Sequence, residues 1–104
     1  MTDKPELPLG RKEYAEGVWV QFKTKGYPFK LRREWESLTD DAAVLGIVLR
    51  YVESWSLKDV NGNEIVLGPD PAVLDGAEDA LIVWLIGSFS RFWRVELPTV
   101  PKNA

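Results

Sequence analysis

Asp59, Asn61 and Asn63 are the residues whose spacing comes closest to a metal site. They match the first, third and fifth positions of a calcium-binding loop between two expected helices, and Asp70 would stand at the twelfth position. That loop needs glycine at its sixth position, where this chain has Glu64, and a bidentate glutamate at its last position. We therefore interpret the segment as a plain hairpin turn and expect no bound metal.

Catalytic chemistry has few candidate side chains in this sequence. The chain contains no cysteine and no histidine, which removes thiol nucleophiles, thiolate metal ligands and the commonest general base. The carboxylate pairs Asp40-Asp41 and Glu78-Asp79 stand where helices are expected to begin, and helix capping accounts for them there. A glycine-rich phosphate loop is also absent from the sequence. We therefore expect a protein that is not an enzyme and that holds no cofactor.

A basic and aromatic cluster lies between residues 22 and 33. Such a cluster can bind single-stranded nucleic acid by stacking and phosphate contacts, but the net charge of −3 argues against nucleic acid and against an anionic membrane. Two interpretations remain open: a solvated strand face whose lysines discourage sheet aggregation, and a docking patch for an acidic protein. The candidate partner-binding residues in this cluster are Lys23, Tyr27, Lys30 and Arg32.

Hydrophobic periodicity indicates the elements that would position the cluster. Apolar and polar residues alternate over 17–24, which predicts a strand, and we expect a second strand over 29–35. Gly26 and Pro28 lie in the short connection between them. The sequence therefore predicts a β-hairpin over residues 17–35.

The remainder of the chain reads as two helices and a second hairpin. Apolar residues recur at three- and four-residue spacing over 42–54, which predicts a helix. An Asn-Gly pair inside 55–67 predicts a hairpin with a tight turn. One helical turn is expected at 71–74, and a last helix over 77–95.

These elements amount to a small α+β domain with two β-hairpins and two main α-helices. A length of 104 residues leaves room for one core only. We expect the domain to span 11–97, between a flexible arm at 1–10 and a flexible tail at 98–104. The opening residues do not resemble a signal peptide, and the longest apolar run is far short of the roughly 20 residues that cross a bilayer. A cytoplasmic protein without a membrane partner is expected.

The last helix has more apolar surface than one face of a small domain would cover. Its first half is apolar on nearly every side, so it must be covered all round. Exposed apolar patches usually mark protein contacts, so we expect self-association or partner binding here, with burial in the monomer core as the open alternative. The candidate residues are Trp84, Phe89, Phe92 and Trp93.

Over residues 18–95 the order of these features resembles small bacteriophage tail assembly chaperones. The likeness consists of the expected basic, aromatic hairpin from Phe22 to Arg33, a helix, the expected hairpin with the motif Trp55-x-Leu57-x-Asp59-x-x-Gly62-Asn63, and a closing apolar helix. It implies a non-enzymatic protein that binds the long tape-measure protein in the host cytoplasm during tail assembly and does not remain in the virion. A structural virion subunit (a head–tail connector or tail completion protein) and a small inhibitory binder of a host protein stay open as alternatives.

Overall fold

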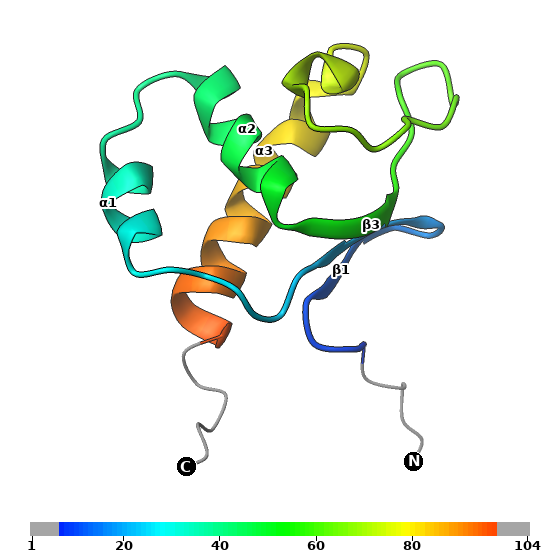
Figure 1. Cartoon of the computed structure of the whole chain (residues 1–104). Coiled ribbons are helices and arrows are strands. Elements are labelled where there is room, and N and C mark those ends of the chain that lie inside the picture. Colours follow the sequence, from blue (N-terminus) through cyan, green and yellow to red (C-terminus); the bar gives the residue numbers. More distant parts are fainter. Residues whose placement is uncertain (1–6, 98–104) are drawn as a thin grey trace, which may run out of the picture.

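The computed structural model of the chain describes residues 7–97 and shows an α+β fold, the class that the sequence predicts (Figure 1). Residues 1–6 of the predicted arm and the predicted tail at 98–104 lie outside the described residues. The elements in chain order are β1 (Arg11–Ala15), β2 (Val18–Phe22), α1 (Lys30–Glu36), α2 (Asp41–Arg50), β3 (Val52–Ser56), the 3₁₀ turn η1 (Pro71–Leu74), α3 (Asp79–Arg91) and the π-helical turn η2 (Phe92–Glu96).

Three antiparallel strands form one sheet, in the order β1-β2-β3. The predicted strand over 17–24 is confirmed as β2, the central strand. Its hairpin partner is β1, which the sequence did not reveal because Arg11–Ala15 shows no alternation of apolar and polar residues. The connection is only two residues long and ends in Gly17, whose φ of 79° is accessible to glycine at little cost.

The predicted strand over 29–35 is wrong, and so is the predicted hairpin over 17–35. These residues form α1, which begins after Pro28, whose carbonyl accepts a hydrogen bond from the Leu31 amide at 3.0 Å. Leu31 and Trp35 lie four residues apart, so a helix places both on one face, where Leu31 is fully buried. The apparent alternation came from basic residues that in fact lie on the exposed side of a short helix.

The predicted helix over 42–54 is correct only in its first part. It corresponds to α2, which ends at Arg50, and Val52–Ser56 continues as β3. The Lys23 amide donates a hydrogen bond to the Tyr51 carbonyl at 2.7 Å, and β3 then pairs with β2. Pairing with a neighbouring strand outweighs the local helical pattern, and that strand is remote in the sequence.

The predicted second hairpin, over 55–67, is present only as a tight loop. Lys58 and Glu64 form one isolated bridge, and the Ile65 amide donates to the Leu57 carbonyl at 2.9 Å. Gly62 has a φ of 84°, but its amide donates to the Asp59 carbonyl at 2.9 Å, so the turn spans residues 59–62 and Gly62 closes it instead of lying at its centre beside Asn61. Trp55 and Ser56 belong instead to β3 and pair with β2, so the ladder of a full second hairpin does not form.

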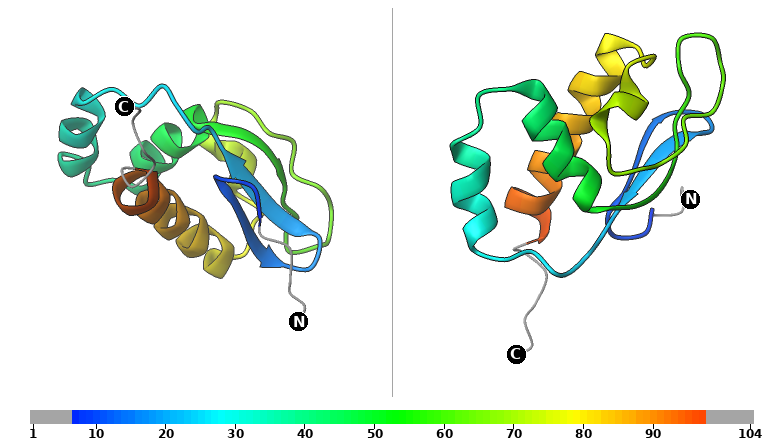
Figure 2. Two further views of the ribbon diagram at one scale, coloured as in Figure 1. Left: turned by 90° about the horizontal axis from the view of Figure 1, so that it is seen from below. Right: turned by 45° about the horizontal axis from the view of Figure 1, so that its top comes forward.

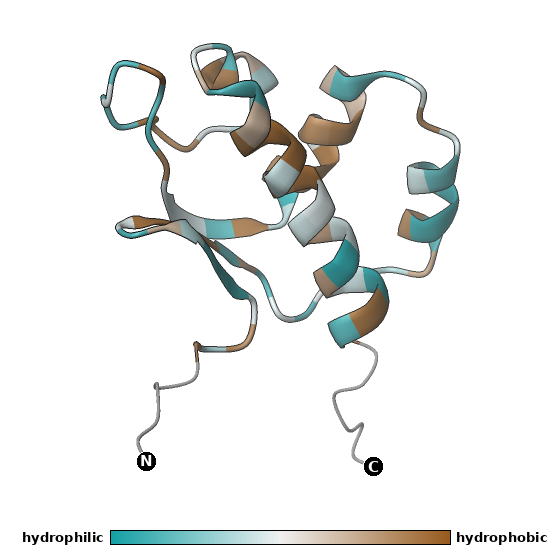
Figure 3. Ribbon diagram, turned by 180° about the vertical axis from the view of Figure 1, so that it is seen from behind, coloured by the Kyte–Doolittle hydropathy of each residue, from teal (hydrophilic) through white to brown (hydrophobic). Residues whose placement is uncertain are grey.

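The helices α2 and α3 lie between α1 and the sheet (Figures 1 and 2). From the sheet, Phe22 reaches the last helix, with ring centroids 5.4 Å from Phe89 and 5.9 Å from Phe92. The predicted helix over 77–95 is confirmed as α3 and η2, and its first half is the strongly hydrophobic ribbon in Figure 3. Within residues 7–97, none of the helices has the length and apolar character needed to span a bilayer.

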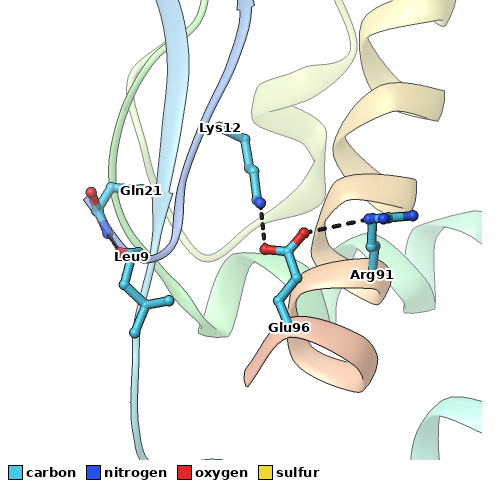
Figure 4. A network of polar contacts seen from close by, with 5 residues as sticks. All are labelled: Leu9, Lys12, Gln21, Arg91 and Glu96. Carbon is cyan, nitrogen blue, oxygen red and sulfur yellow. Dashed lines mark hydrogen bonds and ion pairs between the residues drawn. The ribbon is translucent and has the colours of Figure 1, made fainter. Parts of the chain in front are cut away.

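An ion-pair network fastens the first strand to the last helical turn (Figure 4). The Glu96 carboxylate pairs with the Lys12 ammonium of β1, and its other oxygen lies 3.4 Å from the Arg91 guanidinium. Next to it the Gln21 side-chain amide donates to the Leu9 carbonyl at 2.8 Å. The two ion pairs of Glu96 join η2 to β1 and to α3, and η2 also carries Trp93, which lines the site described next.

Candidate protein-binding site

Three of the predicted partner-binding residues lie in the core instead of on the surface. Phe89 and Phe92 are fully buried and Trp93 is only 7% exposed, so the exposure expected for them is wrong. The domain covers them because aromatic rings from four other parts of the chain gather around the same helix. The rings whose centroids lie within about 6 Å of Phe89, in addition to that of Trp93, belong to Phe22, Tyr27, Trp35 and Tyr51.

Trp84 lies apart from this cluster, on the side of α3 that faces β1. It is half-buried, and its ring centroid is 5.2 Å from that of Tyr14. Together with Ser88 and Glu96 it borders a groove against the segment 7–13. The structure therefore separates Trp84 from Trp93, although the sequence suggested one common surface for both.

Part of the basic and aromatic cluster lines one pocket, together with Trp93. A pocket of about 340 Å³ opens between the segment before α1, α1 itself and the end of the last helix. We call this pocket and the residues 23–33 around it the basic–aromatic face. The pocket is lined by Tyr27, Pro28, Phe29, Arg32, Trp93 and Leu97.

Of the predicted residues, Lys23 and Lys30 lie within the basic–aromatic face and are exposed, without lining the pocket. Sequence reasoning missed Phe29 and Leu97. Phe29 is 75% exposed although it directly precedes the helix α1. One sequence feature could have identified Phe29. Leu31 and Trp35 have the four-residue spacing of one helix face, and Phe29 does not fit that spacing, so its ring falls outside the buried stripe.

Tyr27 positions the loop that carries the pocket. Its hydroxyl donates a hydrogen bond to the Lys23 carbonyl at 2.8 Å, and its ring stacks on Tyr51 with centroids 4.5 Å apart. Burial raises the pKa of the Tyr27 hydroxyl well above its usual range, and the neighbouring Tyr51 adds to the effect. The loop between β2 and α1 is thus fixed to the core by a neutral tyrosine.

The electrostatics of the face differ from those of the chain as a whole. The segment 23–33 contains five basic residues and no acidic residue, whereas the whole chain has a net charge of −3. The Arg33 guanidinium lies 5.9 Å from the centroid of the Phe29 ring, and Arg94 lies at the same distance from Trp93. The pocket is therefore an apolar site with a cationic rim.

Within residues 7–97 the structure has no group of three or more histidine, cysteine, aspartate or glutamate side chains able to hold a metal, and no buried polar or charged side chain. The Asp59 carboxylate accepts hydrogen bonds from the amides of Asn61 and Asn63, at 2.9 and 3.0 Å. It closes its own turn, as the interpretation of this segment as a turn requires.

The motif that suggested the chaperone family also serves the fold. The Trp55 indole donates to the Ile65 carbonyl at 2.8 Å, and Leu57 is fully buried. With the Asp59 turn and Gly62, the whole motif is occupied in closing this loop over the core. Comparison with protein-family models, curated proteins and solved structures finds no match for the chain.

Proposed function

We propose that this protein acts by binding another protein through the basic–aromatic face, without catalytic chemistry of its own. The observation that carries the proposal is Phe29, a large apolar ring that is 75% exposed beside a pocket on a fixed scaffold. Exposing it gains nothing for the fold, and exposed aromatic residues next to pockets are typical anchors of protein interfaces. The basic rim adds attraction and selectivity for a partner of opposite charge.

The specific role that we propose is that of a tail assembly chaperone, which binds a tape-measure protein in the host cytoplasm during tail morphogenesis. Its support is what remains of the resemblance, namely the motif from Trp55 to Asn63 and the closing apolar helix, because the two hairpins on which the likeness also rested do not form. A structural virion subunit or an inhibitor of a host protein would use the same face with a different partner. The identity of the partner therefore separates these three roles.

Affinity capture from the native source tests the proposal with a matched pair of variants. The face variant combines Phe29→Ala with Arg32→Glu, both at exposed positions. The control combines Val66→Ala, 80% exposed, with Lys58→Glu, in the loop at the far side of the molecule. We expect wild type and control to retain the same partner and the face variant to lose it. A partner retained equally by all three proteins would contradict the proposal.

The captured partner then decides the role. A long tape-measure protein supports the chaperone, whereas constituents of finished particles support a structural subunit and a host enzyme supports an inhibitor. Self-association stays a prediction, and sedimentation of the purified protein over a range of concentrations measures it. Loss of self-association in the face variant alone would make a second copy the partner.

A further inference from the structure

We infer that the basic–aromatic face recognises an acidic peptide segment that inserts one apolar side chain into the pocket beside Phe29. This inference rests on the proposed function and adds the chemistry of the partner to it. The occupant is a segment of another protein in which an aromatic or large aliphatic residue stands next to several carboxylates. The apolar residue and the carboxylates of this segment would each occupy one of two neighbouring hollows on the surface.

The first hollow takes the apolar side chain. Its volume of about 340 Å³ is at the lower end of the roughly 300–1,000 Å³ typical of ligand pockets. Its walls come from Tyr27, Trp93 and Leu97, with Phe29 at the exposed edge. The aromatic cluster behind Trp93 holds these walls in place, so binding needs little ordering of the protein.

The second hollow takes the carboxylates. It lies along the outer side of the last helix and encloses about 470 Å³, with Arg91 and Arg94 at its sides. Arg32 lines both hollows, so they are neighbours at this side chain. The small residues Gly87 and Ser90 form part of its lining and leave room for a backbone to approach. A segment that crosses from one hollow to the other therefore passes three guanidinium groups.

The protein's own glutamates show what these arginines bind. Arg94 lies 3.9 Å from Glu36, and Arg91 lies 3.4 Å from Glu96. The arginine side chains remain 37% and 72% exposed in these pairs. Because a guanidinium carries five donors in a planar fork, each arginine keeps donors for a further carboxylate. Carboxylate ligands thus fit this face both by charge and by geometry.

A single-stranded nucleic acid fits the same face less well. Nucleic-acid grooves stack successive bases on a series of open rings. Of the pocket's three rings, Phe29 alone is largely exposed, since Trp93 is 7% exposed and Tyr27 is half-buried. One anchor pocket with flanking arginines suits a peptide better.

Selection from a random peptide library displayed on a carrier tests the inference with the full chain as bait. We expect a consensus with one aromatic or large aliphatic residue and flanking aspartates or glutamates. The Phe29→Ala variant should fail to enrich this consensus, whereas Val66→Ala should enrich it. A basic or uncharged consensus would overturn the inference, and so would one that resembles the chain's own Thr99-Val100-Pro101. Failure of wild type to enrich any sequence would overturn it as well.

Fluorescence anisotropy of a selected peptide, labelled with a dye, then measures each part separately. We expect Phe29→Ala and Arg32→Glu each to weaken the affinity about tenfold or more, the scale of one anchor residue. Lys58→Glu, an exposed position in the far loop, should leave it within about twofold. Affinity should fall as salt is raised. Equal affinity of Arg32→Glu and wild type, or tighter binding of a single-stranded oligonucleotide than of the peptide, would overturn the inference.

The two experiments fail in different ways. A native partner that the face variant loses, combined with a peptide consensus without carboxylates, would retain the proposed function and reject the acidic ligand. An acidic consensus combined with a native partner bound equally by the face variant would reject the proposed function instead.

Discussion

At the scale of single residues, the aromatic side chains divide between two tasks. Phe89 and Phe92 serve the core, where each is fully buried, and Phe29 lies outside it with three quarters of its surface exposed. The sequence alone could not distinguish buried from exposed phenylalanines here, because all three lie in segments that contain both apolar and polar residues. What distinguishes them in the structure is whether other aromatic rings pack against the side chain, and several pack against Phe89.

Replacing Phe89 by alanine tests its place in the core. Because the ring is fully buried among other rings, we expect Phe89→Ala to lower the free energy of unfolding by about 3–5 kcal/mol. Urea unfolding followed by tryptophan fluorescence measures it. The control is Val83→Ala on the same helix, 64% exposed, which should change the value by less than about 0.5 kcal/mol. A Phe89→Ala protein as stable as this control would mean that the ring is not part of the core.

The raised pKa of Tyr27 predicts how stability depends on alkaline pH. The unfolded chain loses the tyrosine proton near pH ~10, whereas the folded protein keeps it to higher pH. The contribution of Tyr27 is therefore complete below about pH 10 and is lost as pH rises toward the folded-state pKa. We expect the free energy of unfolding, measured in urea on both sides of this pH, to fall above it. In Tyr27→Phe the fall should be shallower, and an equally steep fall would contradict the assignment.

At the scale of elements, sequence patterns succeeded where local signals decide the structure. The central strand β2, the 3₁₀ turn η1, the presence of a turn near Gly62 and the last helix follow from alternation, capping and turn residues. The failures are β1, α1 and β3. In β1 and β3 the conformation depends on pairing with a strand elsewhere, and in α1 it depends on docking of Leu31 and Trp35 against a helix more than fifty residues later.

Because α1 docks through few residues, it should be the helix most sensitive to one substitution. Trp35 touches the core with its ring centroid 5.5 Å from both Phe89 and Trp93. We expect Trp35→Ala to raise the rate of amide hydrogen exchange in Lys30–Glu36 and to leave β2 protected. Exchange measured by mass spectrometry resolves the two segments. Unchanged exchange in α1, or equal loss of protection in β2, would show that α1 is not an independently docked element.

At the scale of the whole molecule, basic side chains and acidic side chains gather around different hollows. The basic–aromatic face lies around α1 and the end of the last helix, where Arg91 and Arg94 extend it. The exposed carboxylates of Asp41, Asp70 and Asp75 border a shallow hollow at the start of α2, beside η1. Such a separation orients an approaching charged partner before contact.

The candidate site could be predicted only in part, because it is formed by segments that are far apart in the sequence. The sequence grouped Lys23, Tyr27, Lys30 and Arg32 because they are neighbours in the chain, and two of them, Tyr27 and Arg32, line the pocket. It could not place Trp93 beside Tyr27, or separate it from Trp84, because these relations depend on how the last helix crosses the rest of the domain. A site formed by segments far apart in the sequence can be recognised only from the folded structure.

Site-specific photo-crosslinking in the native source tests the central claim most directly. A photoreactive phenylalanine analogue at position 29 lies at the edge of the pocket, and the same analogue at position 66 lies on the far loop with similar exposure. We predict a covalent adduct with one partner protein from position 29 and none from position 66. An adduct at position 66 together with none at position 29 would contradict the account, because the partner would then bind a different face.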